Sequence, residues 1–116
     1  RSGETGVEVD AKDLPLAEVS IFDLINAFSD VLRKASARDG FSEIIEDKYT
    51  VSDKIEEILY TLRDRSELIF GDLFAQAQSR TEIVVTFLAL LELIRLQRLK
   101  VRQDSAFGEI HVIKVT

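Results

Sequence analysis

The sequence predicts a mainly helical chain with a small β element, an α+β fold. Three segments between residues 20 and 97 repeat apolar residues at helical spacing. Two short segments, 99–103 and 109–115, then alternate apolar and polar residues and are joined by a connection that includes Gly108. Helices followed by a two-stranded hairpin are the element order of a winged helix. We therefore expect a winged-helix domain preceded by an amphipathic helix and an extended arm.

The chain divides into three parts by composition. Residues 1–19 have no period of 2 or 3.6 and hold Pro15, the only proline, so we expect a flexible arm there. Both a disordered end and a segment that a partner orders fit this composition. Residues 20–40 are expected to form an amphipathic linker helix, and residues 41–116 the winged-helix domain. Because methionine is absent, we expect the chain to be a piece of a larger protein.

The first helix is predicted from Ser20 to Ala37. Ser20 is suited to cap its start, and Asp23 stands three residues later in the capping-box position. Apolar residues at i, i+3 and i+4 spacing define one face: Ile21, Leu24, Ile25, Phe28, Val31, Leu32 and Ala35. The pair Asp39-Gly40 is expected to end the segment.

The middle of the chain predicts a second helix and a short plug. Residues 41–49 are ambiguous, and Ser42–Ile45 would fit a short edge strand. Thr50 is a suitable cap for a helix that runs to about Arg65. Five large apolar residues then crowd into positions 68–74 around Gly71, which predicts a short helix that fills the core.

The third helix is predicted from Ser79, with Glu82 completing a capping box, to about Gln97. It is apolar on two sides, whereas a helix on the surface of a small domain normally has one apolar stripe. The first stripe holds Val85, Ala89, Leu93 and Leu96, with Leu90 at its margin; the second holds Val84, Phe87, Leu88, Leu91 and Ile94, flanked by Arg95 and Arg98. We expect the first to face the core. The second is covered either by a protein partner or by the first helix packing across it.

The composition argues against catalytic, metal and cofactor sites. The chain has no cysteine, one histidine (His111) and no glycine-rich phosphate loop, so we expect no enzyme, no metal and no cofactor. No apolar run is long enough to span a membrane. The net charge of −6 argues against a general nucleic-acid binder. The basic bias of Arg95, Arg98, Lys100 and Arg102 nevertheless leaves a winged-helix DNA-binding domain of a transcriptional regulator as the alternative function.

The tract Thr81–Leu96 and the signature Gln103-x-x-x-Phe107-Gly108-Glu109-Ile110 closely resemble the C-terminal winged helix of the segregation and condensation protein A family, the bacterial kleisins. Val51–Leu59 and Ser20–Phe28 also look like the family, so the resemblance covers about residues 14–115. The family's N-terminal helical domain has no counterpart here. Ala106 stands where eukaryotic kleisins often have proline.

This resemblance implies a non-catalytic adaptor in chromosome condensation and segregation. Kleisin C-terminal domains dock on the ATPase head of a structural maintenance of chromosomes (SMC) protein, and the family's contact positions correspond here to Phe87, Leu91 and Gln103. The helical wheel adds Leu88 and Arg95 to this SMC-head interface. The resemblance also implies contact of the arm and first helix with the dimeric segregation and condensation protein B. It further implies an indirect association with DNA and a cytoplasmic, nucleoid-associated location.

Overall fold

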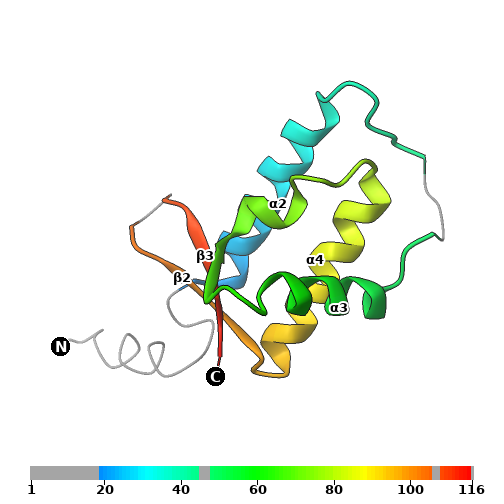
Figure 1. Cartoon of the computed structure of the whole chain (residues 1–116). Coiled ribbons are helices and arrows are strands. Elements are labelled where there is room, and N and C mark those ends of the chain that lie inside the picture. Colours follow the sequence, from blue (N-terminus) through cyan, green and yellow to red (C-terminus); the bar gives the residue numbers. More distant parts are fainter. Residues whose placement is uncertain (1–18, 45–47, 106–107, 116) are drawn as a thin grey trace.

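The computed structural model describes residues 19–44, 48–105 and 108–115. Its helices are α2 (Ile21–Ser36), α3 (Val51–Thr61), the 3-10 helix η1 (Phe70–Phe74) and α4 (Arg80–Arg95); its strands are β1 (Glu67–Ile69), β2 (Leu99–Gln103) and β3 (Ile110–Lys114). The helices lie on one side of the sheet (Figure 1). The winged helix proper runs from α3 to β3, with α2 as an additional helix before it, so the predicted α+β class is confirmed.

The sheet has one strand more than the predicted hairpin. Its order is β1-β3-β2, and both pairings are antiparallel. Val112 at the centre pairs with Leu68 on one side and with Val101 on the other, and all three side chains are buried. Residues that alternate with them, such as Lys100 and His111, point away from the helices. The sheet therefore has one core face and one face that none of the helices in residues 19–44, 48–105 and 108–115 covers.

Each long helix begins at a polar cap that the sequence indicated. Ser20 accepts a hydrogen bond from Asp23 N while the Asp23 carboxylate accepts one from Ser20 N, which completes the predicted capping box. Thr50 caps α3 by accepting a hydrogen bond from Asp53 N. The helix ends at Thr61, four residues before the expected Arg65. Ser79 caps α4, but only half of the predicted box forms. The Glu82 carboxylate accepts from Gln78 N instead of from Ser79 N.

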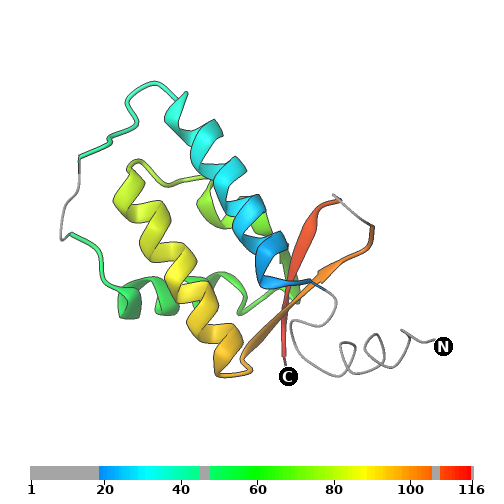
Figure 2. The same cartoon turned by 180° about the vertical axis from the view of Figure 1, so that it is seen from behind.

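The core is centred on four aromatic rings from α2, η1 and α4. Phe28 stacks on Phe87 with ring centroids 4.2 Å apart. Phe74 lies 6.2 Å from Phe28, Phe70 lies 6.2 Å from Phe87, and the Phe70 and Phe74 centroids are 5.1 Å apart. Figure 2 shows α2 lying beside α4 and running antiparallel to it. The short plug predicted at 68–74 is confirmed as η1, whose two phenylalanines are buried. Because Leu24 and Ala35 of α2 are also fully buried, α2 belongs to the same core as α4.

Two further predictions concern the edge strand at residues 42–45 and the arm at residues 1–19. The short edge strand that residues 42–45 would fit is not present among residues 42–44, where Ser42 makes only a single parallel bridge to Ser79. Ile45 lies outside the described residues. The arm predicted for residues 1–19 also lies outside the described residues, except for Val19, which is buried. Gly40 has φ +80°, a conformation that favours glycine at the turn after α2.

Candidate functional site

The outward side of α4 carries a narrow apolar stripe. Val84, Leu88, Leu91 and Arg95 follow one another at i, i+4, i+7 and i+11 and form what we call the exposed stripe. Leu88 is 46% exposed, Arg95 is exposed, and the other two are half-buried. An exposed leucine by itself needs no explanation, but three apolar residues in a row on one helix form a patch that a partner can cover.

Phe87 does not belong to this surface. Its side chain is 7% exposed and lies under Phe28 of α2. The expectation that Phe87 is open to a partner is therefore wrong, and the alternative arrangement, in which the first helix packs across the second stripe, holds for Phe87. Ile94 of the same stripe is also buried. The physical reason is the apolar face of α2, which finds its largest apolar neighbours on this side of α4.

The predicted core stripe is also only partly buried. Ala89, Leu90 and Leu93 are buried and Val85 is half-buried, whereas Leu96 is 49% exposed. Leu96 is the C-cap of α4, and the chain turns away at Gln97, which has φ +61°. The helix thus ends one residue too early for Leu96 to reach the core.

Arg95 closes the exposed stripe with an ion pair. Its Nε lies 3.0 Å from Oε1 of Glu92, and a second guanidinium nitrogen binds the other carboxylate oxygen. These hydrogen bonds lower the pKa of Glu92 below its ordinary value. The pair is local to one turn of α4 and exposed to solvent, so it adds little to stability. It presents a charged edge next to Leu91 and Leu88.

Gln103 lies at the end of β2 and is not part of the exposed stripe. Its Nε2 donates a 2.8 Å hydrogen bond to the Gly108 carbonyl, which ties the two ends of the hairpin together. The side chain also lines a cavity of about 700 Å³ between α2 and the hairpin, which Asn26, Val31 and Ile110 help to form. The structure therefore gives Gln103 a defined role in holding the hairpin.

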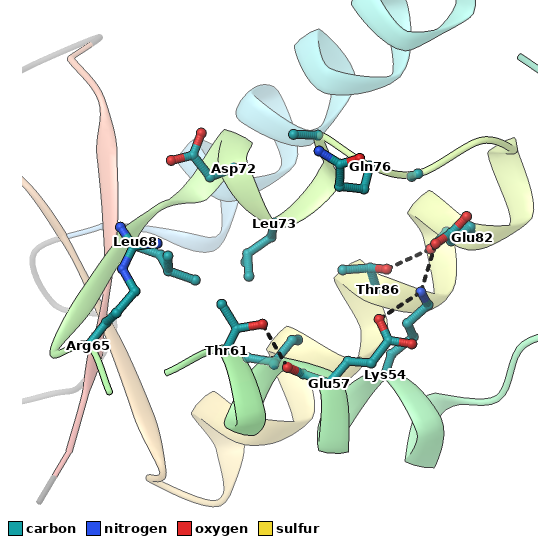
Figure 3. A pocket seen from close by; sticks show the side chains of 13 residues that line it. Lys54, Glu57, Thr61, Arg65, Leu68, Asp72, Leu73, Gln76, Glu82 and Thr86 are labelled. Atoms are coloured by element: carbon teal, nitrogen blue, oxygen red, sulfur yellow. Dashed lines mark hydrogen bonds and ion pairs between the residues drawn. The ribbon is translucent and has the colours of Figure 1, made fainter. Parts of the chain in front are cut away.

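A second cavity, of about 410 Å³, lies between α3, η1 and α4 and contains the one strongly buried cation among the described residues. Figure 3 shows Lys54 of α3 pointing toward Glu82 of α4, with Glu57 on its other side. The Lys54 Nζ lies 2.8 Å from Glu82 and 3.2 Å from Glu57. It also lies 4.8 Å from the centre of the Tyr49 ring.

The ionisation of this pair is set by burial and attraction together. Burial by itself lowers the pKa of Lys54, but hydrogen bonds and attraction from Glu82 and Glu57 outweigh it, so that the pKa lies above its ordinary value. Burial likewise raises the pKa of Glu82, and the bonds from Lys54 and Gln78 N bring it below its ordinary value. Both groups are charged at neutral pH and clamp α3 to α4. Sequence reasoning missed this pair, because nothing in the spacing of Lys54 and Glu82 indicates contact.

Sequence reasoning also missed a second apolar area at the start of α2. Ile21, Phe22 and Ile25 are exposed, and Phe22 is the most exposed large apolar side chain of the described residues, at 73%. The helical spacing of α2 placed Ile21 and Ile25 on the core face, but in the structure only Leu24 between them is fully buried, while Ile21 is 39% and Ile25 45% exposed.

Within the described residues, no group of three or more histidine, cysteine or acidic side chains is arranged to hold a metal ion. None of the helices seen in this part of the chain has both the length and the apolar character needed to cross a bilayer.

Comparisons with known proteins identify the family. The family model described as "Segregation and condensation protein ScpA" matches residues 4–115, which is nearly the whole chain. The chain belongs to the segregation and condensation protein A family. The resemblance carried by Thr81–Leu96 and by the hairpin signature is thereby confirmed.

Several segregation and condensation A proteins are similar to the chain. That of Caldanaerobacter subterraneus subsp. tengcongensis is 36% identical over 93 residues, which are 80% of this chain and 38% of the relative. That of Brevibacillus brevis is 33% identical over 99 residues, 85% of this chain and 39% of the relative. That of Clostridium acetobutylicum is 31% identical over 114 residues, 94% of this chain and 45% of the relative. The chain thus spans less than half the length of these relatives.

Proposed function

We propose that this chain is a non-catalytic adaptor that docks on the ATPase head of an SMC protein and so takes part in chromosome condensation and segregation in the cytoplasm, at the nucleoid. Membership of the segregation and condensation protein A family supports the process. The observation that carries the proposal is the exposed stripe of α4. It presents Leu88 and Leu91 next to Arg95, where a DNA-reading helix would present side chains that hydrogen-bond to base edges.

Within this proposal, Leu88 and Leu91 make the direct contact and Arg95 borders it. Phe87 supports the contact from beneath, because it holds α4 against Phe28. A direct contact of Phe87 with the head would require α2 to move away from α4. Gln103 contributes by fixing the hairpin through its bond to Gly108. The five residues inferred from the sequence thus divide into surface residues and supporting residues.

A second contact belongs to the start of α2. We propose that Ile21, Phe22 and Ile25 meet the dimeric segregation and condensation protein B, together with the arm that precedes them. Their exposure supports this, since an apolar first turn in water forgoes about 1.5–3 kcal/mol for each large side chain that stays exposed. Contact with DNA through this adaptor role is indirect.

The decisive experiment measures the affinity of the chain for a purified SMC head by titration calorimetry. We expect Leu88→Arg to weaken binding at least about 30-fold, as a hot-spot residue at the centre of an interface does. The matched control is Ile44→Arg, which places the same charge at an apolar residue that is 69% exposed in the loop after α2.

Circular dichroism and thermal melting should show both variants folded, because neither side chain lies in the core. An SMC head that binds Leu88→Arg as tightly as the unchanged chain would exclude the exposed stripe as the contact. A loss of the same size for Ile44→Arg would show that added positive charge, and not the stripe, causes the effect.

A further inference from the structure

Three segments that are far apart in the sequence meet at one end of the sheet. They are Arg63–Ser66 before β1, Arg98–Lys100 at the start of β2 and Ile113–Val115 at the end of β3. Backbone hydrogen bonds join them: Lys114 N donates to Ser66 O at 2.9 Å, and Val115 N donates to Arg98 O at 3.1 Å. This end of the sheet is thus a fixed part of the fold.

The side chains gathered there are mostly cationic. The basic cluster consists of Arg63, Arg65, Arg98 and Lys100. Two carboxylates, Asp64 and Glu67, lie in the three segments and the adjoining strand of this chain, whose net charge is −6, and Asp64 lies 3.6 Å from the guanidinium of Arg63. Lys114 also lies there, but it is half-buried and its Nζ donates to Arg63 O at 3.4 Å. Glu67 is already engaged by His111, whose Nδ1 lies 3.0 Å from its carboxylate. The cluster is therefore a positively charged patch on a molecule whose net charge is negative.

The cationic groups are accessible. Arg65, Arg98 and Lys100 are exposed, and no carboxylate of the residues that the structure describes forms an ion pair with them. The Arg63 side chain is 62% exposed and its guanidinium lies 4.5 Å from the centre of the Tyr60 ring, which is itself 67% exposed. Exposed cations beside an exposed aromatic ring are typical of surfaces that contact nucleic acid.

We propose that the basic cluster binds the phosphate backbone of double-stranded DNA without reading its sequence. Lysine and arginine supply affinity for DNA by displacing counterions from phosphates, and this term does not depend on base identity. The cluster lies on turns and at the start of a strand, and not on a helix that could enter the major groove, so we expect the contact to position the molecule on DNA without selecting a site. This direct contact is separate from the SMC-head contact proposed above and does not depend on it.

A different explanation applies to Lys100 in particular. It lies on β2, which is an edge strand, and lysines on edge strands keep sheets from pairing with other chains. That explanation does not extend to Arg63, Arg65 and Arg98, which lie in turns. It also predicts no affinity for DNA, so a binding measurement separates the two.

The test is fluorescence anisotropy of the 116-residue chain with a labelled 30-base-pair duplex of arbitrary sequence at a series of salt concentrations. If three to five phosphates are contacted, the logarithm of the binding constant should fall with the logarithm of salt with a slope of about −3 to −4.5. The variant Arg98→Glu/Lys100→Glu should flatten this slope by about 2 and weaken binding at least tenfold at about 50 mM salt. A duplex of scrambled sequence should bind with the same affinity.

The matched control is Arg33→Glu/Lys34→Glu, which makes the same change of charge on α2, where both residues are exposed and outside the cluster. Thermal melting checks that both double variants are folded. The control should keep the slope of the unchanged chain. Absence of saturable binding at about 50 mM salt, or an equal loss in the control, would overturn the proposal.

Discussion

Phe87 contacts two other aromatic rings, and its position explains why it contributes to stability and not to the surface. Stacking on Phe28 and edge contact with Phe70 fill the space between α2, η1 and α4. We expect Phe87→Ala to lower the free energy of unfolding by about 3–5 kcal/mol, because it leaves a cavity in this cluster. Urea unfolding followed by circular dichroism measures the loss.

The neighbour Leu88 provides the contrast. Leu88→Ala removes a side chain of similar apolar character from the surface, and we expect a change within about 0.5 kcal/mol. Equal losses for the two variants would mean that α2 does not cover Phe87 in solution.

Lys54 gives a prediction that depends on pH. Lys54→Met leaves the Glu82 carboxylate, whose side chain is 15% exposed, without its cation, and we expect a loss of about 3 kcal/mol at pH 7. The pKa of Lys54 is raised in the fold, so its contribution is complete below its ordinary pKa and is lost as pH rises through the folded value. The pKa of Glu82 is lowered, so its contribution is present above its ordinary pKa and is lost as pH falls through the folded value.

The difference in unfolding free energy between Lys54→Met and the unchanged chain should therefore be largest between about pH 5 and pH 10. It should shrink toward pH 3, below the ordinary pKa of a glutamate, because the lowered pKa of Glu82 makes its contribution to stability fall as the pH falls. Urea titrations at pH 3, 7 and 9 measure it. A difference that stays constant from pH 7 to pH 3 would contradict the clamp between α3 and α4.

At the scale of an element, α4 ends in a helix-capping motif in which Gln97 occupies the position usually held by glycine. Arg98 N donates to Leu93 O at 2.8 Å and Gln97 N donates to Ile94 O at 2.9 Å, which is the pattern of a Schellman motif. Gln97 occupies the left-handed position with φ +61°, where glycine is the usual residue. The turn directs the chain from α4 into β2.

We expect Gln97→Gly to raise the free energy of unfolding by about 0.5–1 kcal/mol, because glycine adopts this conformation without strain. Thermal unfolding monitored by circular dichroism provides the measurement. Gly40→Ala is the reciprocal control: Gly40 has φ +80° and open space around it, so alanine there should destabilise by strain alone. A stabilised Gly40→Ala would show that these turns do not constrain the backbone.

Elements with local signals could be predicted from the sequence, and elements made by distant pairing could not. Capping residues and apolar spacing placed α2, α3, α4 and the hairpin strands to within a few residues, because these signals lie within one segment. β1 was missed because it has three residues and runs directly into the apolar η1, so it shows no alternation of its own. Its existence depends on β3, more than forty residues later.

The same limit applies to the candidate site. The helical wheel identified correctly that α4 has more apolar surface than one face needs, but it could not show which part α2 covers. Phe87 and Leu88 are adjacent in sequence, and their different burial is decided by the Phe28 ring. The interface assignment for Leu88, Leu91 and Arg95 stays a prediction.

At the scale of the whole molecule, the two proposed contacts use different elements. The exposed stripe lies on α4, whereas the basic cluster lies on the turns and strands at one end of the sheet. We therefore expect Leu88→Arg to leave DNA affinity within about twofold and Arg98→Glu/Lys100→Glu to leave affinity for the SMC head within about twofold. Anisotropy and calorimetry on the same protein preparations measure the two.

A mixture of head, DNA and the unchanged chain should then contain a ternary complex, detectable by size-exclusion chromatography with absorbance at two wavelengths. If each variant reduced both affinities, the two surfaces would have to be one. Independent losses are the expected pattern, because sites that are well separated on a small fold usually act additively.

The position of β3 has a consequence for how the protein is made. Among the strands that the structure describes, β3 comes last in sequence and lies at the centre of the sheet, so neither β1 nor β2 has a partner until residues 110–114 have left the ribosome. Until then the inner side chains Leu68 and Val101 have no strand to cover them. A translation product that stops before Ile110 would have helices but no sheet, and would expose apolar strands to aggregation or to proteases. We therefore expect cellular proteases to degrade a chain that stops before Ile110, because its sheet cannot form.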